Sequence, residues 1–191
     1  MRKHPAWPCA LILVAALALS SCEVARQVPF NEAVFKRTSG TGSGTVTGQL
    51  TAGLTSVGWT GRHDSTLVGS NEDIALLPVN AYTDESIQRK YIKGENLADG
   101  DPRYAQYLRI GQTDDHGYFT FRKIPPGDYY VGSEVHWTTY YWFPDQDNNL
   151  QKWAVWHTTM VYARVSVRNG QTSPVTEWHY GKEKKVENLA P

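Results

Sequence analysis

The sequence predicts an all-β domain, folded as a sandwich or a barrel, on two observations. First, short runs rich in β-branched and aromatic residues follow one another, separated by residues that favour turns. These runs span residues 45–51, 74–82, 107–113, 118–124, 129–137, 153–157, 161–167 and 175–180. Second, one segment alone has a helical pattern. Thr83 to Ser86 offer a cap and early acids, and Ile87 and Tyr91 follow at helical spacing. We therefore expect a short helix inserted between strands.

The first 21 residues have the pattern of a secretory signal peptide. Arg2 and Lys3 precede an apolar run, residues 9–19, which ends in small residues. This run is much shorter than the roughly 20 residues that a membrane-spanning helix needs. A retained membrane helix is therefore not expected.

Residues 19–22, Leu-Ser-Ser-Cys, resemble the lipobox of bacterial lipoproteins. The resemblance implies cleavage before Cys22 and a thiol that carries lipid, palmitate among its acyl chains. Burying several acyl chains at about 0.8 kcal/mol per methylene would make this membrane attachment permanent. Glu23 follows the cysteine, which in the enterobacterial sorting rule implies the periplasmic side of the outer membrane rather than the inner membrane. We expect a lipid-anchored protein of the cell envelope; the alternative is a secreted protein with an incidental cysteine.

Composition excludes several classes of function for the mature chain. Removing residues 1–21 from the 191 leaves 170, enough for one domain with a substantial core. Without Arg2 and Lys3 the 19 basic residues become 17 against 19 acidic ones, a net charge of −2. No basic excess supports nucleic-acid binding. Cys9 leaves with the signal peptide and Cys22 would be acylated, so disulfides, thiolate metal sites and cysteine catalysis are not expected.

A turn-and-strand signature covers residues 113–131. It reads Thr113-Asp114-Asp115-His116-Gly117-Tyr118-Phe119-Thr120-Phe121, then Ile124-Pro125-Pro126-Gly127-Asp128-Tyr129-Tyr130-Val131. Asp114 can close an Asx turn, Gly117 can accept a positive φ, and alternating aromatic residues then share one strand face. The signature resembles that of the carboxypeptidase regulatory-like domain.

The resemblance extends over residues 44–180. It implies a seven-stranded antiparallel β-sandwich, prealbumin-like or immunoglobulin-like, that usually serves as a non-catalytic binding, spacer or assembly module. The expected organisation is a signal peptide (1–21), a lipidated flexible tether (22–43), the sandwich (44–181) and a charged C-terminal tail (182–191). Stretches 83–106 and 138–159 exceed the family's usual connections, so we expect the individual function of this chain there.

An aromatic hairpin is predicted between residues 134 and 160. A two-residue reversal at Gln146-Asp147 would pair His136 with His157, Trp137 with Trp156 and Tyr140 with Trp153. Alternation then places one set on one face: His136, Tyr140, Trp142, Trp153 and His157. The other face carries Trp137, Tyr141, Phe143 and Trp156.

A sandwich buries one face of a strand pair, so one aromatic set should stay exposed, where flat rings suit stacking on sugars or peptides. The alternative is that both sets pack. The candidate ligand-binding residues are Trp137, Tyr140, Tyr141, Trp142, Trp153 and Trp156.

Metal and enzyme chemistry have little support in the sequence. His136 and His157 are weak candidates for a metal site, but two imidazoles without a carboxylate are too few, so no metal or cofactor is expected. No G-x-S-x-G, H-E-x-x-H or phosphate-loop motif occurs, and no catalytic residue is named.

Three functions remain open. The first is a membrane-anchored, non-catalytic binding or assembly lipoprotein with an envelope protein or glycan as partner. The second is a carbohydrate- or peptide-binding module that uses an exposed aromatic hairpin. The third is an envelope hydrolase with no recognisable motif.

Overall fold

The computed structural model describes residues 23–58, 61–144 and 147–187. Within these ranges it describes the side chains except those of residues 54–58, 61–64, 143, 153 and 185–187. The predicted signal peptide and Cys22 lie outside the described residues. Among the described helices, none is long and apolar enough to cross a membrane.

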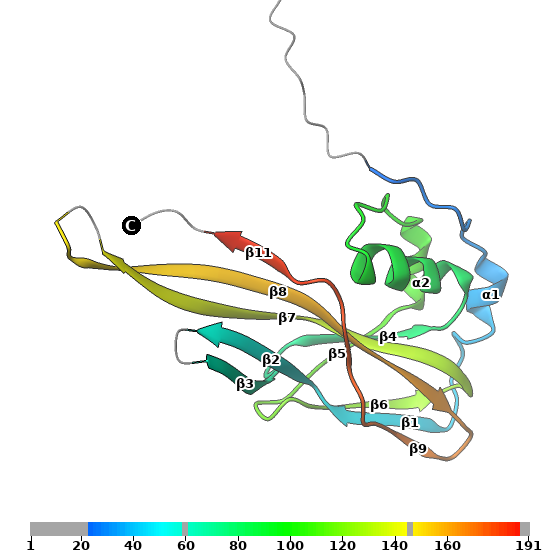
Figure 1. The fold of residues 1–191 in the computed structure, drawn as a ribbon. Coiled ribbons are helices and arrows are strands. Elements are labelled where there is room, and N and C mark those ends of the chain that lie inside the picture. Colours follow the sequence, from blue (N-terminus) through cyan, green and yellow to red (C-terminus); the bar gives the residue numbers. More distant parts are fainter. Residues whose placement is uncertain (1–22, 59–60, 145–146, 188–191) are drawn as a thin grey trace, which may run out of the picture.

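Two facing sheets form a β-sandwich (Figure 1). The first sheet has the order β6-β1-β9, from β1 (Gly44–Gln49), β6 (Tyr118–Ile124) and β9 (Thr172–Val175). The second contains β5 (Arg109–Gln112), β4 (Asp73–Pro78), β7 (Gly127–Pro144) and β8 (Leu150–Val167), adjacent in that order. These strands confirm the predicted sandwich. The structure differs in one pair, because β1 and β9 run parallel.

Four further strands extend this framework. β2 (Thr51–Gly58) and β3 (Gly61–Val68) form a hairpin that the sequence analysis did not identify. β10 (His179–Tyr180) and β11 (Lys184–Glu187) both pair with β8. Residues 184–187 are therefore part of the sheet, which corrects the expectation of a separate charged tail from residue 182.

The main core lies between the two sheets and consists of apolar side chains from alternate strand positions. Its members are Val46, Ile74, Leu76, Phe119, Phe121, Ile124, Tyr129, Val131, Val165 and Val167. The predicted turn before β6 is confirmed: Asp114 Oδ1 accepts the N–H groups of His116 (2.9 Å) and Tyr118 (2.8 Å). Gly117 has a φ of +77°. The turn thus places Phe119 and Phe121 toward the core.

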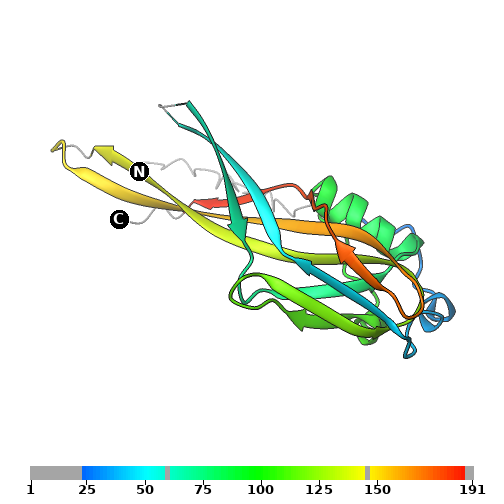
Figure 2. The same ribbon diagram turned by 90° about the horizontal axis from the view of Figure 1, so that it is seen from below.

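A second, smaller core joins the β2–β3 hairpin to the base of the β7–β8 hairpin. Leu50 and Ala52 pack there against Val135 and Val161. Both hairpins project from the same end of the sandwich and diverge (Figure 2). The long strands β7 and β8 have 18 residues each, so they extend well beyond the rest of their sheet.

A helical insert covers the outer face of the second sheet (Figure 1). It consists of α2 (Ala81–Glu85), the π-helix η1 (Ser86–Ile92) and the 3₁₀-helix η2 (Pro102–Tyr107). The insert confirms the predicted helix, but α2 begins earlier, because Asn80 is its cap. The Asn80 side chain accepts the N–H groups of Tyr82 and Thr83, and the Thr83 hydroxyl accepts the N–H of Asn80. The strand predicted over residues 74–82 therefore ends at Pro78.

The segment expected to be a flexible tether instead packs against the helical insert. It contains α1 (Glu32–Lys36), whose Phe35 is 1% exposed. Phe35 lies in a cluster of rings whose other members are Phe30, Tyr82, Tyr104 and Tyr107. Val24 forms a parallel bridge with Leu97. Burial of these rings offsets the entropy lost on ordering the segment, so the tether prediction is wrong for residues 24–37.

The buried carboxylate of Glu85 fixes the same segment. It accepts the backbone N–H groups of Gln27 (2.7 Å) and Val28 (3.2 Å) and a hydrogen bond from Arg89 (3.1 Å). Burial alone would raise the pKa of Glu85, but these donors and the nearby Arg26 outweigh it and hold that pKa below its ordinary value. The charged carboxylate is thus a structural attachment point for the N-terminal segment.

Candidate ligand-binding face

The outer face of the β7–β8 hairpin is the side that carries the helical insert. Tyr130 identifies it, because its hydroxyl donates to Asp84 of α2 at 2.8 Å. Side chains two residues apart on a strand share a face. The even-numbered residues of β7 from 130 to 142, and those of β8 paired with them, therefore lie on this outer face, and the odd-numbered ones lie on the inner face.

The hairpin register differs by one residue from the predicted one. Trp137 pairs with His157, Thr138 with Trp156, and Tyr141 with Trp153. The ladder ends at Pro144 opposite Leu150, so residues 145–149 connect the strands in place of a two-residue reversal. A shift of one residue transfers every side chain of β8 to the opposite face. Trp156 consequently joins Tyr140 and Trp142, while the side chain of Trp153 lies outside those described.

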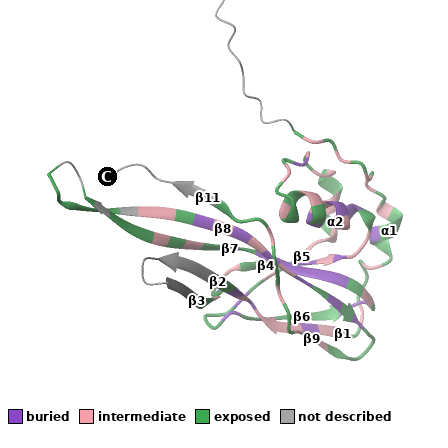
Figure 3. Cartoon of the chain, in the orientation of Figure 1, coloured by how far each residue is buried: buried purple, intermediate pink, exposed green. Residues whose placement is uncertain are grey.

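Three exposed aromatic side chains form what we call the aromatic strip: Tyr140, Trp142 and Trp156 on the outer face. Their exposed fractions are 56%, 59% and 54%. Figure 3 shows that the part of β7 nearest the hairpin loop consists mainly of exposed residues. The Lys152 ammonium lies 3.8 Å from the centroid of the Tyr140 ring and 6.0 Å from that of Trp142. Large rings that lie exposed together on one face are typical of an interaction site.

The inner face of the hairpin has a structural role around His157. The imidazole is 5% exposed and stacks on Trp137, with 5.1 Å between ring centroids. Its Nδ1 lies 2.6 Å from Glu183 Oε1, and its Nε2 lies 2.6 Å from Thr139 Oγ1. The interaction with Glu183 joins β8 to the chain just before β11. Tyr141, also on this face, is 45% exposed.

The two histidines considered as weak metal candidates do not face each other. His136 lies on the outer face opposite Thr158, whereas His157 lies on the inner face. The predicted His136–His157 pairing is therefore wrong. Among the residues that the structure describes, no group of three or more His, Cys, Asp or Glu side chains is placed to hold a metal ion.

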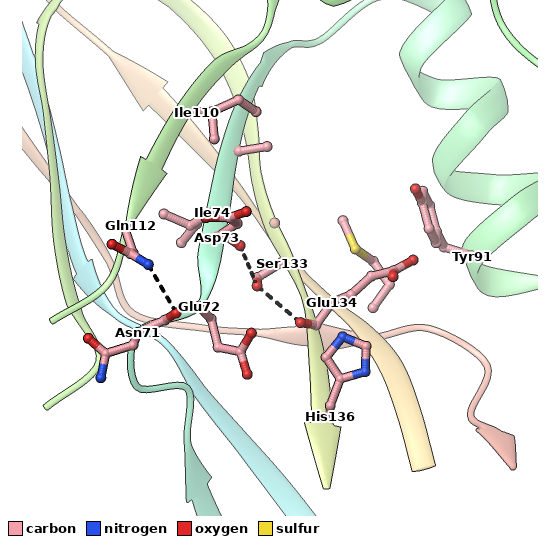
Figure 4. Close-up of a pocket in the computed structure, with 13 residues that line it drawn as sticks. Asn71, Glu72, Asp73, Ile74, Tyr91, Ile110, Gln112, Ser133, Glu134 and His136 are labelled. Carbon is pink, nitrogen blue, oxygen red and sulfur yellow. Dashed lines mark hydrogen bonds between the residues drawn. The ribbon is translucent and has the colours of Figure 1, made fainter. Parts of the chain in front are cut away.

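A pocket of about 530 Å³ lies on the outer face at the base of the aromatic strip. β7 contributes Glu134 and His136, and η1 contributes Tyr91. Asp73 is the first residue of β4, and Glu72 immediately precedes that strand. Figure 4 shows Glu134 extending toward Tyr91, and Glu72 on the same side as His136. Burial raises the pKa of Tyr91, and the carboxylate of Glu134 raises it further. None of the described lining residues is a lysine or an arginine.

Hydrogen bonds hold the walls of the pocket in place. The Ser133 hydroxyl donates to the backbone carbonyl of Asp73 at 2.7 Å, which links β7 to β4. Gln112 of β5 donates to the carbonyl of Asn71 at 3.3 Å. These bonds hold the backbone of the wall and the Gln112 amide, and the same wall carries the carboxylates of Glu72, Asp73 and Glu134. Together with the aromatic strip, this arrangement can stack on a ligand and hydrogen-bond to its polar groups.

The sequence named aromatic residues of the hairpin as candidates and left open whether they are exposed, and it did not predict the pocket. Its lining comes from residues 71–75, 91, 110–112, 132–136 and 160, which only the folded sheet and the insert bring together. One local pattern in the sequence points to the pocket. Glu134 and His136 precede Tyr140 at even spacing on the same strand, so the three side chains share a face.

No family model matches the chain, and a search of curated proteins finds no match. A search of solved structures finds the crystal structure of a "putative carbohydrate binding protein (PA1324)" from Pseudomonas aeruginosa, with a TM-score of 0.56. The two sequences are 26% identical, over 76% of this chain and 94% of that one. The chain is thus similar in fold and sequence to a protein whose structure is described as that of a "putative carbohydrate binding protein".

Proposed function

We propose that this chain is a non-catalytic carbohydrate-binding module, held at the cell envelope by a lipid on Cys22. The observation that carries the proposal is the aromatic strip, in which Tyr140, Trp142 and Trp156 lie exposed on one face of one hairpin. Its ligand is an envelope glycan.

The physical argument is that sugar rings have apolar C–H faces and polar edges. Indole and phenol rings bind such faces because they combine a flat apolar surface with a polar group. Carboxylates and amides beside the rings, as in the adjacent pocket, supply the hydrogen bonds that give orientation. The similarity to the Pseudomonas aeruginosa protein supports the same ligand class.

Calorimetric titration of the full-length protein with a panel of oligosaccharides tests the ligand. The protein is kept in a detergent that has no sugar headgroup. Replacing Trp142 and Trp156 together with alanine should weaken binding by at least about 30-fold, since an aromatic side chain that the ligand buries contributes about 2 kcal/mol or more.

The matched control is Tyr118→Ala, which removes a ring that is 55% exposed on β6 of the other sheet. This variant should bind as the parent does. Equal affinities of the parent and the double variant would contradict the proposal. The anchor is tested separately: Cys22→Ser should move the protein from the membrane fraction to the soluble fraction.

A further inference from the structure

The pocket and the aromatic strip form one continuous surface. Glu134 and His136 of β7 line the pocket, and Tyr140 and Trp142 follow on the same face of the same strand. At about 3.4 Å per residue, the distance from Glu134 to Trp142 is about 27 Å. Such a length suits a linear oligosaccharide better than a single sugar.

The two ends of this surface differ in shape. Tyr91 of the helical insert borders the pocket end, whereas the strip end continues to the hairpin loop without any part of the insert above it (Figures 1 and 4). A chain lying along β7 therefore meets a wall at one end only. Its terminal unit would occupy the pocket, and the following units would lie over the rings.

The two ends also differ in charge. Glu72, Asp73 and Glu134 line the pocket, which has no lysine or arginine in its described lining. Carboxylates only accept hydrogen bonds, so the group in the pocket must supply donors, and a cation is favoured over an anion. At the other end, Lys152 places an ammonium over Tyr140 and near Trp142.

We propose that the pocket is the end subsite for an amine-bearing hexosamine unit of a linear glycan, whose next units stack on Trp156, Tyr140 and Trp142. This inference rests on the proposed function and specifies its ligand. The ammonium of the sugar pairs with the carboxylates of Glu134 and Glu72. A uronate unit is disfavoured in the pocket, because its carboxylate would face those of Glu134 and Glu72.

Titration with three defined tetrasaccharides tests the inference: a glucosamine tetramer, its fully N-acetylated counterpart and a galacturonate tetramer. The glucosamine tetramer should bind most tightly and the galacturonate tetramer most weakly. Glu134→Gln should weaken binding of the glucosamine tetramer by about 5- to 30-fold, the difference between a charge-assisted and a neutral hydrogen bond. Its effect on the N-acetylated tetramer should stay within about 2-fold.

Glu72→Gln changes a carboxylate on the other wall of the pocket. This second variant should likewise weaken binding of the glucosamine tetramer much more than binding of the N-acetylated tetramer. Glu177→Gln is the matched control, since it removes an equal charge from an exposed position outside the pocket. Raising the salt concentration should weaken binding of the glucosamine tetramer and leave binding of the N-acetylated tetramer nearly unchanged. Thermal unfolding of each variant verifies that it is folded.

Three results would overturn the inference, and they distinguish a failure of the pocket assignment from a failure of the proposed function. If both pocket variants behave as Glu177→Gln does, or if the galacturonate tetramer binds as tightly as the glucosamine tetramer, the pocket assignment is wrong. The proposed function then stands as long as the Trp142 and Trp156 double variant still loses affinity. If no sugar binds the parent protein, the proposed function fails and the inference fails with it.

Discussion

Replacing Glu85 with glutamine should release the N-terminal segment from the helical insert. The Glu85 side chain is 4% exposed, and its two oxygens together accept the N–H groups of Gln27 and Val28 and a hydrogen bond from Arg89. Glutamine keeps one carbonyl oxygen as an acceptor and presents an NH₂ group in place of the second carboxylate oxygen. A backbone N–H group that donated to that second oxygen then faces a donor and loses its hydrogen bond.

The magnitude follows from these contacts. A hydrogen bond to a charged group contributes about 1.5–3 kcal/mol, and leaving a buried donor unpaired costs about 1–3 kcal/mol. Since the segment can adjust in part, we expect a loss of about 2–4 kcal/mol in the free energy of local opening. At about 1.4 kcal/mol per factor of ten, this corresponds to amide exchange at Gln27 and Val28 that is roughly 30- to 1,000-fold faster.

Native-state hydrogen exchange measures this opening directly, and global unfolding by urea serves as a second readout. The matched control is Glu32→Gln in α1, whose carboxylate forms a more exposed pair with Lys36; it should change the exchange of Gln27 and Val28 much less. Unchanged exchange at Gln27 and Val28 in the Glu85 variant, with those amides protected in the parent, would refute the reasoning.

Three other predictions follow from the structure. The pKa of Glu85 lies below its ordinary 4.5, so its contribution to holding the N-terminal segment is complete above pH 4.5 and is lost as the pH falls through the lowered pKa. Acid should therefore accelerate amide hydrogen exchange at Gln27, after correction for intrinsic exchange rates. Glu85→Gln should abolish this pH dependence. Gly117→Ala should lower the free energy of unfolding, measured by urea titration, by more than about 1 kcal/mol. The reason is that the φ of Gly117 is +77° and the new Cβ would lie 2.7 Å from Val68 Cγ1. A free energy of unfolding equal to the parent's would contradict this. Phe35→Ala should cost about 3–5 kcal/mol in the local stability of α1, seen as increased proteolysis before residue 44; a cleavage pattern like the parent's would rule it out.

Local patterns predicted the sandwich well, because its strands carry their own information. Phe119 and Phe121 alternate onto the core, and the turn before them is specified by Asp114 and Gly117 within a few residues. The β2–β3 hairpin gave no comparable pattern. Glycines such as Gly53 interrupt it, and the second core that holds its base depends on contacts with residues far away in the chain.

The aromatic residues of the candidate site could be named from the sequence, but neither their exposure nor their grouping could be predicted. The register of the β7–β8 hairpin depends on the length of the connection at 145–149, and one residue decides whether Trp156 accompanies Trp142 or lies on the opposite face. Likewise, the composition before residue 44 favours a tether, yet Phe30 and Phe35 find ring partners that only the folded insert assembles.

The bridge between Val24 and Leu97 would determine how freely the protein moves on a membrane. Backbone hydrogen bonds to Asn96 (2.7 Å) and from Ala98 (2.9 Å) fix Val24, only two residues after Cys22. A lipid on Cys22 would then have a leash of about 7 Å, whereas 20 free residues could extend to about 70 Å. The anchored domain would keep its helical insert next to the bilayer, and it would sample glycans from a fixed height instead of sweeping through the surrounding volume.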